Sequence, residues 1–253
     1  MIAKLALRTL VIVALFIGGI AAAIAGHFFI GLTVHLLLVG ILLADTLNPN
    51  SRLFGPIETT CSTGVWLTLD DGPDPHDTPV ILDLLDKHGA KATFFVIGKK
   101  AEQHPELIRE IVRRGHRIGN HTWSHPQASF WCHGPIRTYR EIARCQQVIA
   151  SITGEAPTEF RAPVGHSNIF VHPVLGKLGL RLVGWSSRGF DGVSASLPEV
   201  TRRIRATATD GGILLAHEAT PIAREVVAEI LVLAAEKGWV FVIPDALPRS
   251  ENC

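Results

Sequence analysis

The feature that most constrains this chain is a long N-terminal stretch without charge. No Asp, Glu, Lys or Arg lies between Thr9 and Leu43. A helix crosses a bilayer with ~20 apolar residues, and about 17 can suffice. The stretch is therefore too long for one span, and it divides near Gly26-His27 into two segments close to the lower limit. We predict that residues 1–47 form a hydrophobic membrane anchor of two short helices.

The charges that flank this stretch bear on its orientation. Lys4 and Arg8 precede it and Arg52 follows it. Because basic flanks stay on the cytoplasmic side, a helical hairpin in a bacterial inner membrane is favoured, with the domain on the cytoplasmic face. Two alternatives stay open. A single signal-anchor helix would place the domain outside, and a cleaved signal peptide would release it, although the apolar run exceeds the usual core of about 7–15 residues.

Composition indicates one globular domain behind the anchor. The 253 residues carry 24 Lys and Arg against 23 Asp and Glu, and 47% of them are apolar. A nucleic-acid partner is not expected, because no basic run exists to neutralise phosphates. Disorder is excluded by the high apolar content and the low net charge. We predict an irregular linker over residues 48–63, rich in Pro, Asn and Ser, and a folded domain over residues 64–253.

Strand and helix patterns alternate along the domain. Strand-like runs lie at residues 65–69, 92–97, 116–120, 158–161, 180–185, 213–216 and 239–243, and helical runs at 78–87, 105–114, 136–152, 198–207 and 222–236. Repeated β–α units predict a parallel sheet, either open or closed into a barrel. In both cases the chemistry belongs at the carboxyl ends of the strands.

Polar side chains follow several of these strands, so the sheet would bring them to one rim: Asp70, Asp71, His121, His125, Arg161, Asp191 and His217. His121 and His125 are four residues apart, and a helical turn would place both imidazoles on one face, where they can bind one metal. A carboxylate as third ligand would leave a position open for water, which is typical of a catalytic metal. Adjacent Asp70 and Asp71 diverge in an extended segment, so one can bind the metal while the other acts as a base.

Four segments in this order resemble the motifs of the NodB-homology polysaccharide deacetylases, carbohydrate esterase family 4. They read TLDDGP at residues 68–73, HTWSH at 121–125, RAPVG at 161–165 and LAH at 215–217. The resemblance covers about residues 65–244 and leaves out the N-terminal stretch. It implies a distorted (β/α) barrel and metal-dependent removal of an N-acetyl group from an amino sugar.

Carried over position by position, the resemblance assigns the reacting groups. Asp71, His121 and His125 would bind a divalent metal. Asp70 would be the general base and His217 the general acid. Two nitrogens and one carboxylate suit Zn²⁺ and also Co²⁺, Ni²⁺ or Fe²⁺, because geometry rather than affinity decides among these metals in the cell.

The resemblance also assigns positioning and substrate-binding residues. Arg161 matches the residue that holds the base carboxylate, and Leu215 matches one that lines the pocket for the acetyl methyl group. Val164 stands where an aromatic residue is common but still offers its main-chain N–H, and we expect Trp123 to stack on a sugar. The fourth motif of the family, which aligns with residues 188–192 between RAPVG and LAH, departs most from the pattern. Of its acids only Asp191 remains, which leaves open how Arg161 is itself held.

Taken together, these features predict a membrane-anchored, metal-dependent hydrolase that removes N-acetyl groups from amino sugars of envelope glycans. The alternative substrate is a lipid-linked amino sugar that is deacetylated or deformylated. A domain on the cytoplasmic face would favour this alternative, because it cannot reach mature wall polymer. A non-catalytic glycan-binding protein is the alternative of another class, and the presence of every proposed ligand, base and acid argues against it.

Overall fold

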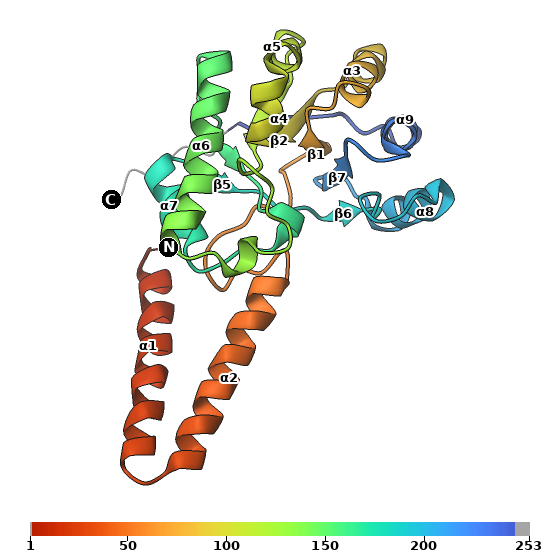
Figure 1. The fold of residues 1–253 in the computed structure, drawn as a ribbon. Coiled ribbons are helices and arrows are strands. Elements are labelled where there is room, and N and C mark those ends of the chain that lie inside the picture. Colours follow the sequence, from red (N-terminus) through yellow and green to blue (C-terminus); the bar gives the residue numbers. More distant parts are fainter. Residues whose placement is uncertain (1, 246–253) are drawn as a thin grey trace.

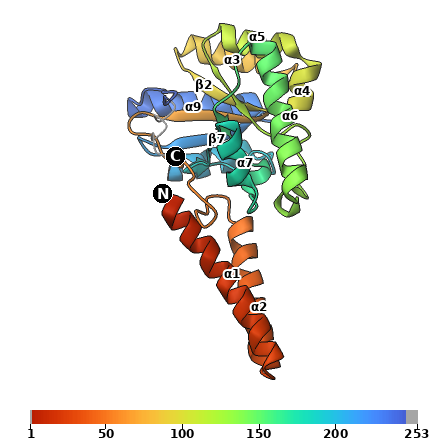
Figure 2. The same cartoon turned by 90° about the vertical axis from the view of Figure 1, so that its left-hand side faces the viewer.

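The computed structural model describes residues 2–245, which form a helical hairpin and an α/β domain (Figure 1). The hairpin consists of α1 (Ile2–Ile24) and α2 (Phe28–Leu47). Gly26 lies in the turn with a φ of 88°, a left-handed conformation that favours glycine. The chain is thus divided into two helices at the position that the sequence predicts. In both views the hairpin projects from one end of the domain as a narrow rod (Figures 1 and 2).

The hairpin presents apolar side chains on its outside. By length and composition α2 could cross a membrane, whereas the apolar part of α1, Leu10–Ile24, is shorter. Phe29, Leu36 and Leu37 of α2 are all more exposed than buried. Exposed apolar surface of this extent is unusual on a soluble protein. The hairpin is therefore consistent with a membrane anchor or a signal segment.

The connection from the hairpin to the domain is irregular, and it packs closely against the domain. Asn50 donates a side-chain hydrogen bond to the carbonyl of Trp185 over 2.8 Å. Pro49 lies so close to Gly165 that a side chain at Gly165 would collide with it. The predicted linker is therefore part of the domain's surface layer.

The domain is built on a parallel sheet, which has seven strands within residues 2–245, in the order β5-β4-β3-β2-β1-β7-β6. The strands are β1 (Trp66–Gly72), β2 (Ala92–Val96), β3 (Arg117–Asn120), β4 (Glu159–Phe160), β5 (Arg181–Leu182), β6 (Ser187–Arg188) and β7 (Ile213–His217). The edge strands β5 and β6 are separated along the chain by residues 183–186 alone. This short segment joins the two edges of the sheet, and the predicted distorted barrel is confirmed.

Helices cover the outside of the sheet (Figures 1 and 2). They are α3 (Asp77–Lys87), α4 (Gly98–Gln103), α5 (Pro105–Arg113), α6 (Pro135–Thr153), α7 (Val171–Leu178), α8 (Leu197–Thr207) and α9 (Ala223–Lys237), with 3-10 turns η1 (Phe130–Cys132) and η2 (Pro163–Gly165). Helices α4 and α7 are not predicted from the sequence, and β6 is not predicted as a strand of its own.

The alternation of side chains along β1 separates two cores. Leu67 and Leu69 pack outward into the large apolar cluster beneath the helices. Trp66 belongs instead to the cluster inside the barrel, together with residues of β2 and β7. Because side chains on one face of a strand recur every second residue, Thr68 and Asp70 share the inner face with Trp66. The barrel interior is therefore apolar where β1 begins and polar where β1 ends.

The predicted strand at residues 239–243 is wrong. This segment makes one isolated bridge, between Phe241 and Val65, and no ladder within the described chain. The reason is topological, because β1 already pairs with β2 on one side and with β7 on the other. Residues 239–243 are rich in β-forming residues, but β1 has no free edge with which they could pair.

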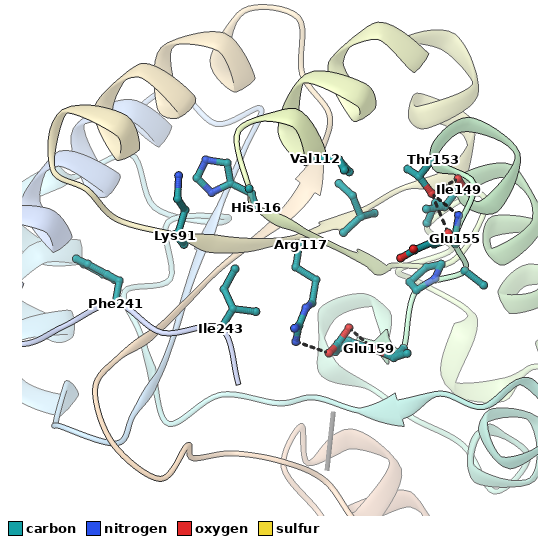
Figure 3. Close-up of a pocket in the computed structure, with 15 residues that line it drawn as sticks. Lys91, Val112, His116, Arg117, Ile149, Thr153, Glu155, Glu159, Phe241 and Ile243 are labelled. Atoms are coloured by element: carbon teal, nitrogen blue, oxygen red, sulfur yellow. Dashed lines mark hydrogen bonds and ion pairs between the residues drawn. The ribbon is translucent and has the colours of Figure 1, made fainter. Parts of the chain in front are cut away.

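A pocket of about 750 Å³ lies at the amino ends of β3 and β4, the opposite end of the sheet from the predicted rim (Figure 3). Its charged lining includes Glu159, which is fully buried. The Glu159 carboxylate accepts hydrogen bonds from Arg117 over 3.0 Å and from Arg181 over 2.7 Å. This charge network holds the starts of β3, β4 and β5 together.

We predict that Glu159→Ala lowers the free energy of unfolding by about 3 kcal/mol, because it leaves two partly buried guanidinium groups without their shared carboxylate. Urea denaturation of the full chain, followed by tryptophan fluorescence, measures this change. Glu155→Ala is the matched control, since Glu155 lines the same pocket but is exposed. A loss in the Glu159 variant no larger than in the control would contradict this role.

Candidate metal centre

Three of the predicted side chains converge at the carboxyl ends of β1 and β3. Asp71 Oδ1 lies 3.2 Å from His125 Nε2 and 3.6 Å from His121 Nε2. Tetrahedral ligands held about 2.1 Å from a metal lie roughly 3.4 Å from one another, which matches this spacing. In addition, Asp71 Oδ1 is buried and has no hydrogen-bond partner in the described part of the chain. The three residues thus fit a divalent metal.

The backbone of the two histidines is a loop and not the helical turn that their spacing predicted. Thr122 and His125 have φ values of 66° and 51°, and Asp71 has 70°. All three lie in the left-handed region, which is costly for residues with a side chain and persists only where the surroundings enforce it. The helical expectation for His121 and His125 is therefore wrong, although both imidazoles do reach one point.

Hydrogen bonds from neighbouring residues impose this loop conformation. Asn120, the last residue of β3, accepts from the Thr122 N–H over 3.0 Å and donates to the carbonyl of Ile142 over 2.9 Å. The Glu141 carboxylate accepts from the N–H of Ser124 over 2.9 Å. Sequence reasoning missed Asn120 and Glu141. An amide side chain directly before the histidine motif is the one signal that could have indicated Asn120.

The tautomer of His121 is set by the backbone of the next motif. Its Nδ1 lies 2.9 Å from the carbonyl oxygen of Arg161, so Nδ1 carries the proton and donates it there. Burial, followed by the nearby His125, lowers the pKa of His121 to about 3. The imidazole is thus neutral, and the lone pair of Nε2 faces the ligand site, as metal binding requires.

Arg161 is buried, and all three nitrogens of its guanidinium donate hydrogen bonds. Nη1 donates to Asp70 Oδ1 over 2.7 Å and to Thr68 Oγ1 over 2.8 Å. Nη2 donates to the carbonyl of Gly184 over 2.7 Å, and Nε donates to that of Val183 over 3.2 Å. Both carbonyls belong to the segment that closes the barrel. The question left open by the altered fourth motif is thereby answered, since main-chain carbonyls and Thr68 hold Arg161.

The pairing with Arg161 orients Asp70 toward the metal site. Burial lowers the pKa of the Arg161 guanidinium, and the charge of Asp70 opposes that effect. With Oδ1 engaged by Arg161, Oδ2 of Asp70 lies 3.7 Å from His121 Nε2. Thr68 was missed from the sequence, although the two-residue period of β1 places it on the same face as Asp70.

His217 ends β7 on the other side of the site and is held by Asp191. Its Nδ1 lies 3.0 Å from Asp191 Oδ1, and its main-chain N–H donates to Asp191 Oδ2 over 2.7 Å. Burial alone would lower the pKa of His217. The hydrogen bond and charge of Asp191, with the charges of Asp70 and Asp71, outweigh burial and raise the pKa to about 9. Asp191 therefore positions His217.

A buried acid, Glu218, follows His217 in the sequence and supports the end of β1. The side chain of Glu218 accepts a hydrogen bond from the Thr78 hydroxyl, and its main-chain N–H donates to the Asp70 carbonyl over 2.9 Å. Burial raises the pKa of Glu218 to about 8. A side chain at Gly72 would collide with Glu218 Oε2, so glycine is required there. Glu218 thus fixes the backbone beside both aspartates.

The three predicted substrate-binding residues occupy different surroundings. Leu215 is buried inside the barrel, whereas Val164 is exposed on η2. Trp123 packs against the large apolar cluster, and the Arg144 guanidinium lies 3.5 Å from its ring centroid. With one ring face occupied, a sugar could stack on Trp123 only from the other side. Substrate contact by these three residues stays a prediction.

Several known proteins have sequences similar to that of this chain. The family model described as polysaccharide deacetylase matches residues 58–183. A peptidoglycan-N-acetylglucosamine deacetylase of Listeria monocytogenes is 35% identical over 72% of this chain. That match spans only 38% of the Listeria protein. A chitooligosaccharide deacetylase of a Bradyrhizobium strain is 37% identical over 69% of this chain and 78% of its own length.

The architecture is similar to that of a solved carbohydrate esterase. The structure of a family 4 carbohydrate esterase from Streptomyces lividans, in complex with acetate, superimposes with a TM-score of 0.66. The two sequences are 32% identical, and the match covers 72% of this chain and 93% of the other. The hairpin lies outside the residues that the family model matches.

We predict that Asp71→Asn and His125→Ala each weaken Zn²⁺ binding more than about 100-fold, because even the loss of an outer-shell partner costs about 10–100-fold. Calorimetric titration of the metal-free full chain measures the affinity. His88→Ala is the control, since His88 is exposed on the surface outside the cluster. Unchanged affinity in both ligand variants would exclude these residues as the metal site.

We also predict that Asp191→Asn lowers the pKa of His217 by more than about one unit, because it removes the charge that stabilises the imidazolium in a buried position. Titration of the ring by NMR in the metal-free chain measures the pKa. The exposed Asp210 provides the control variant, Asp210→Asn. A His217 pKa that stays at the wild-type value would show that Asp191 does not set it.

Proposed function

Because the chain belongs to the polysaccharide deacetylase family, we propose that it is a metal-dependent hydrolase that removes an N-acetyl group from an amino sugar. The three ligand residues converge beside two ion pairs. In one pair Arg161 holds the carboxylate of Asp70, and in the other Asp191 holds the imidazole of His217. Amide hydrolysis needs this combination, because an amide is a poor electrophile and an amine is a poor leaving group. The convergence is the observation that supports the function best.

The metal would be held by Asp71, His121 and His125, and we propose Zn²⁺. When bound, such a metal supplies a Lewis acid that polarises the amide carbonyl and increases the acidity of water. A set of three protein ligands suits this use, because it leaves a coordination position free.

Asp70 acts as the general base in this proposal. Its Oδ1 is occupied by Arg161, so Oδ2 remains to accept a proton from the water that attacks the carbonyl carbon. Arg161 does not touch the substrate and is a positioning residue. Its cation stabilises the charged carboxylate of Asp70 and fixes the direction in which Oδ2 points.

His217 acts as the general acid. Asp191 holds Nδ1, which leaves Nε2 to donate a proton to the departing amine nitrogen. The raised pKa of His217, about 9, keeps this proton in place at neutral pH. General acid–base assistance of this type contributes about 10²–10⁴-fold to the rate.

The substrate is the finer part of the proposal. The names of the two relatives point to N-acetylglucosamine in peptidoglycan or chitooligosaccharides. We propose that Leu215 lines the acetyl pocket and that Val164 and Trp123 contact the sugar. The hairpin favours a second substrate class, a lipid-linked amino sugar, because a membrane anchor would keep the domain at the bilayer.

We expect the full chain to release acetate from an N-acetylglucosamine oligomer when Zn²⁺ is present and to lose this activity after chelation. Asp70→Asn is expected to reduce the rate about 10²–10⁴-fold, since it removes the base without removing a metal ligand. Asp83→Asn, at an exposed acid on α3, is the matched control.

The outcomes separate the competing functions. Metal binding without acetate release from the oligomer would direct the test to a lipid-linked or formylated amino sugar. Acetate release that survives Asp70→Asn would refute the assignment of the base. A non-catalytic glycan-binding protein would bind the oligomer and release no acetate from any of these substrates.

A further inference from the structure

Several exposed or half-buried apolar side chains lie on connections that begin at the rim that holds the metal site. They come from three connections that follow strands: from β3 into the start of α6, from β4 to α7, and from β6 to α8. Because all the strands are parallel, these connections begin at one end of the barrel. The apolar residues are Trp131, Ile136, Val164, Ile169, Phe190 and Val193, with Ile136 exposed to 67% and Val193 to 86%.

The first two of these connections lack negative charge over long stretches, whereas the connection from β6 to α8 contains Asp191. No Asp or Glu occurs from Pro126 to Arg140 or from Arg161 to Phe190. Arg137 and Arg140 are exposed on the first turns of α6, close in sequence to Ile136. Apolar side chains interspersed with cations, in stretches without acids, suit the surface of a bilayer that contains anionic lipids.

The hairpin joins the domain at this rim. Pro49, two residues beyond the end of α2, packs on Gly165, which is the neighbour of Val164 in η2. In both views the hairpin leaves the domain at the end where α7 and the adjacent part of α6 lie (Figures 1 and 2). The point where the hairpin meets the domain therefore lies beside Val164, one of the apolar residues of the rim.

From this proximity, and from the apolar and basic residues on the connections, we infer that the rim docks on the bilayer in which the hairpin lies, so that the metal site opens at the level of the lipid headgroups. The inference rests on the proposed function and on insertion of the hairpin. It narrows the substrate to an amino sugar that is presented at the membrane surface, such as one carried on a lipid. Trp131 would lie at the interface, where tryptophan is favoured because one part of its ring system is apolar and another is polar.

Quenching of tryptophan fluorescence by brominated lipids tests this docking directly. All five Trp residues lie in the domain and none lies in the hairpin. The full chain is placed in nanodiscs of phosphatidylethanolamine and phosphatidylglycerol, with and without bromine near the headgroup end of the acyl chains. We expect quenching in the wild type, and we expect Trp131→Phe to remove about half of it or more.

Trp239→Phe is the matched control. Trp239 is half-buried like Trp131, but it lies near the start of β1, at the far end of the barrel. This variant is expected to retain the quenching of the wild type. Equal quenching of the wild type and the Trp131 variant, or no quenching at all, would overturn the inference.

A second pair of variants tests the surface without altering a tryptophan. Ile169→Glu combined with Val193→Glu places two carboxylates on the rim and is expected to reduce the quenching, whereas Val240→Glu, at a site exposed to 69% at the far end, is not. Undiminished quenching in the double variant would also overturn the inference. Because quenching needs no turnover, failure of docking is distinguishable from failure of the proposed deacetylation.

Discussion

The burial of one cation, Arg161, is the constraint on which the rest of the site depends. A guanidinium buried inside the barrel is tolerated only if its donors are paired, because an unpaired buried charge is very costly. Here the donors engage Asp70, Thr68 and two carbonyls of the barrel-closing segment. Its own carbonyl also receives the Nδ1 proton of His121. One residue thereby connects the base, a metal ligand and the closure of the sheet.

The sequence could predict most of the strands, the major helices and the polar set at the strand ends, because periodicity and order are local properties of the chain. It could not predict the path of the backbone at the metal site. Four-residue spacing suits a helix, yet His125 adopts a left-handed conformation that Asn120 and Glu141 support from outside the motif. Sequence reasoning also could not pair Asp191 with His217, because that contact depends on the pairing of β6 with β7.

The two α-helices that were not predicted, α4 and α7, have sequences with little helical signal. Helix α4 begins with a glycine and has only six residues, so it shows no amphipathic period. Helix α7 contains Pro173 and Gly176, and its buried Val171 and Leu175 hold it against the second apolar cluster. In both cases tertiary packing overrides weak intrinsic propensity. Residues 239–243 show the opposite case. They have high β-propensity, but they form no strand because no free sheet edge is available for pairing.

The connector between the hairpin and the barrel sets how far the domain can work from its anchor. Residues 48–57 would reach roughly 35 Å if they were extended. Pro49 and Asn50 pack on the barrel, and Gly55 lies against His172. The connector is therefore held against the domain and does not extend to this length. With the hairpin inserted as proposed, the domain stays at a fixed distance from the bilayer, because no flexible linker separates the two. Its substrates then come to it along the plane of the membrane, and the encounter becomes a search in two dimensions.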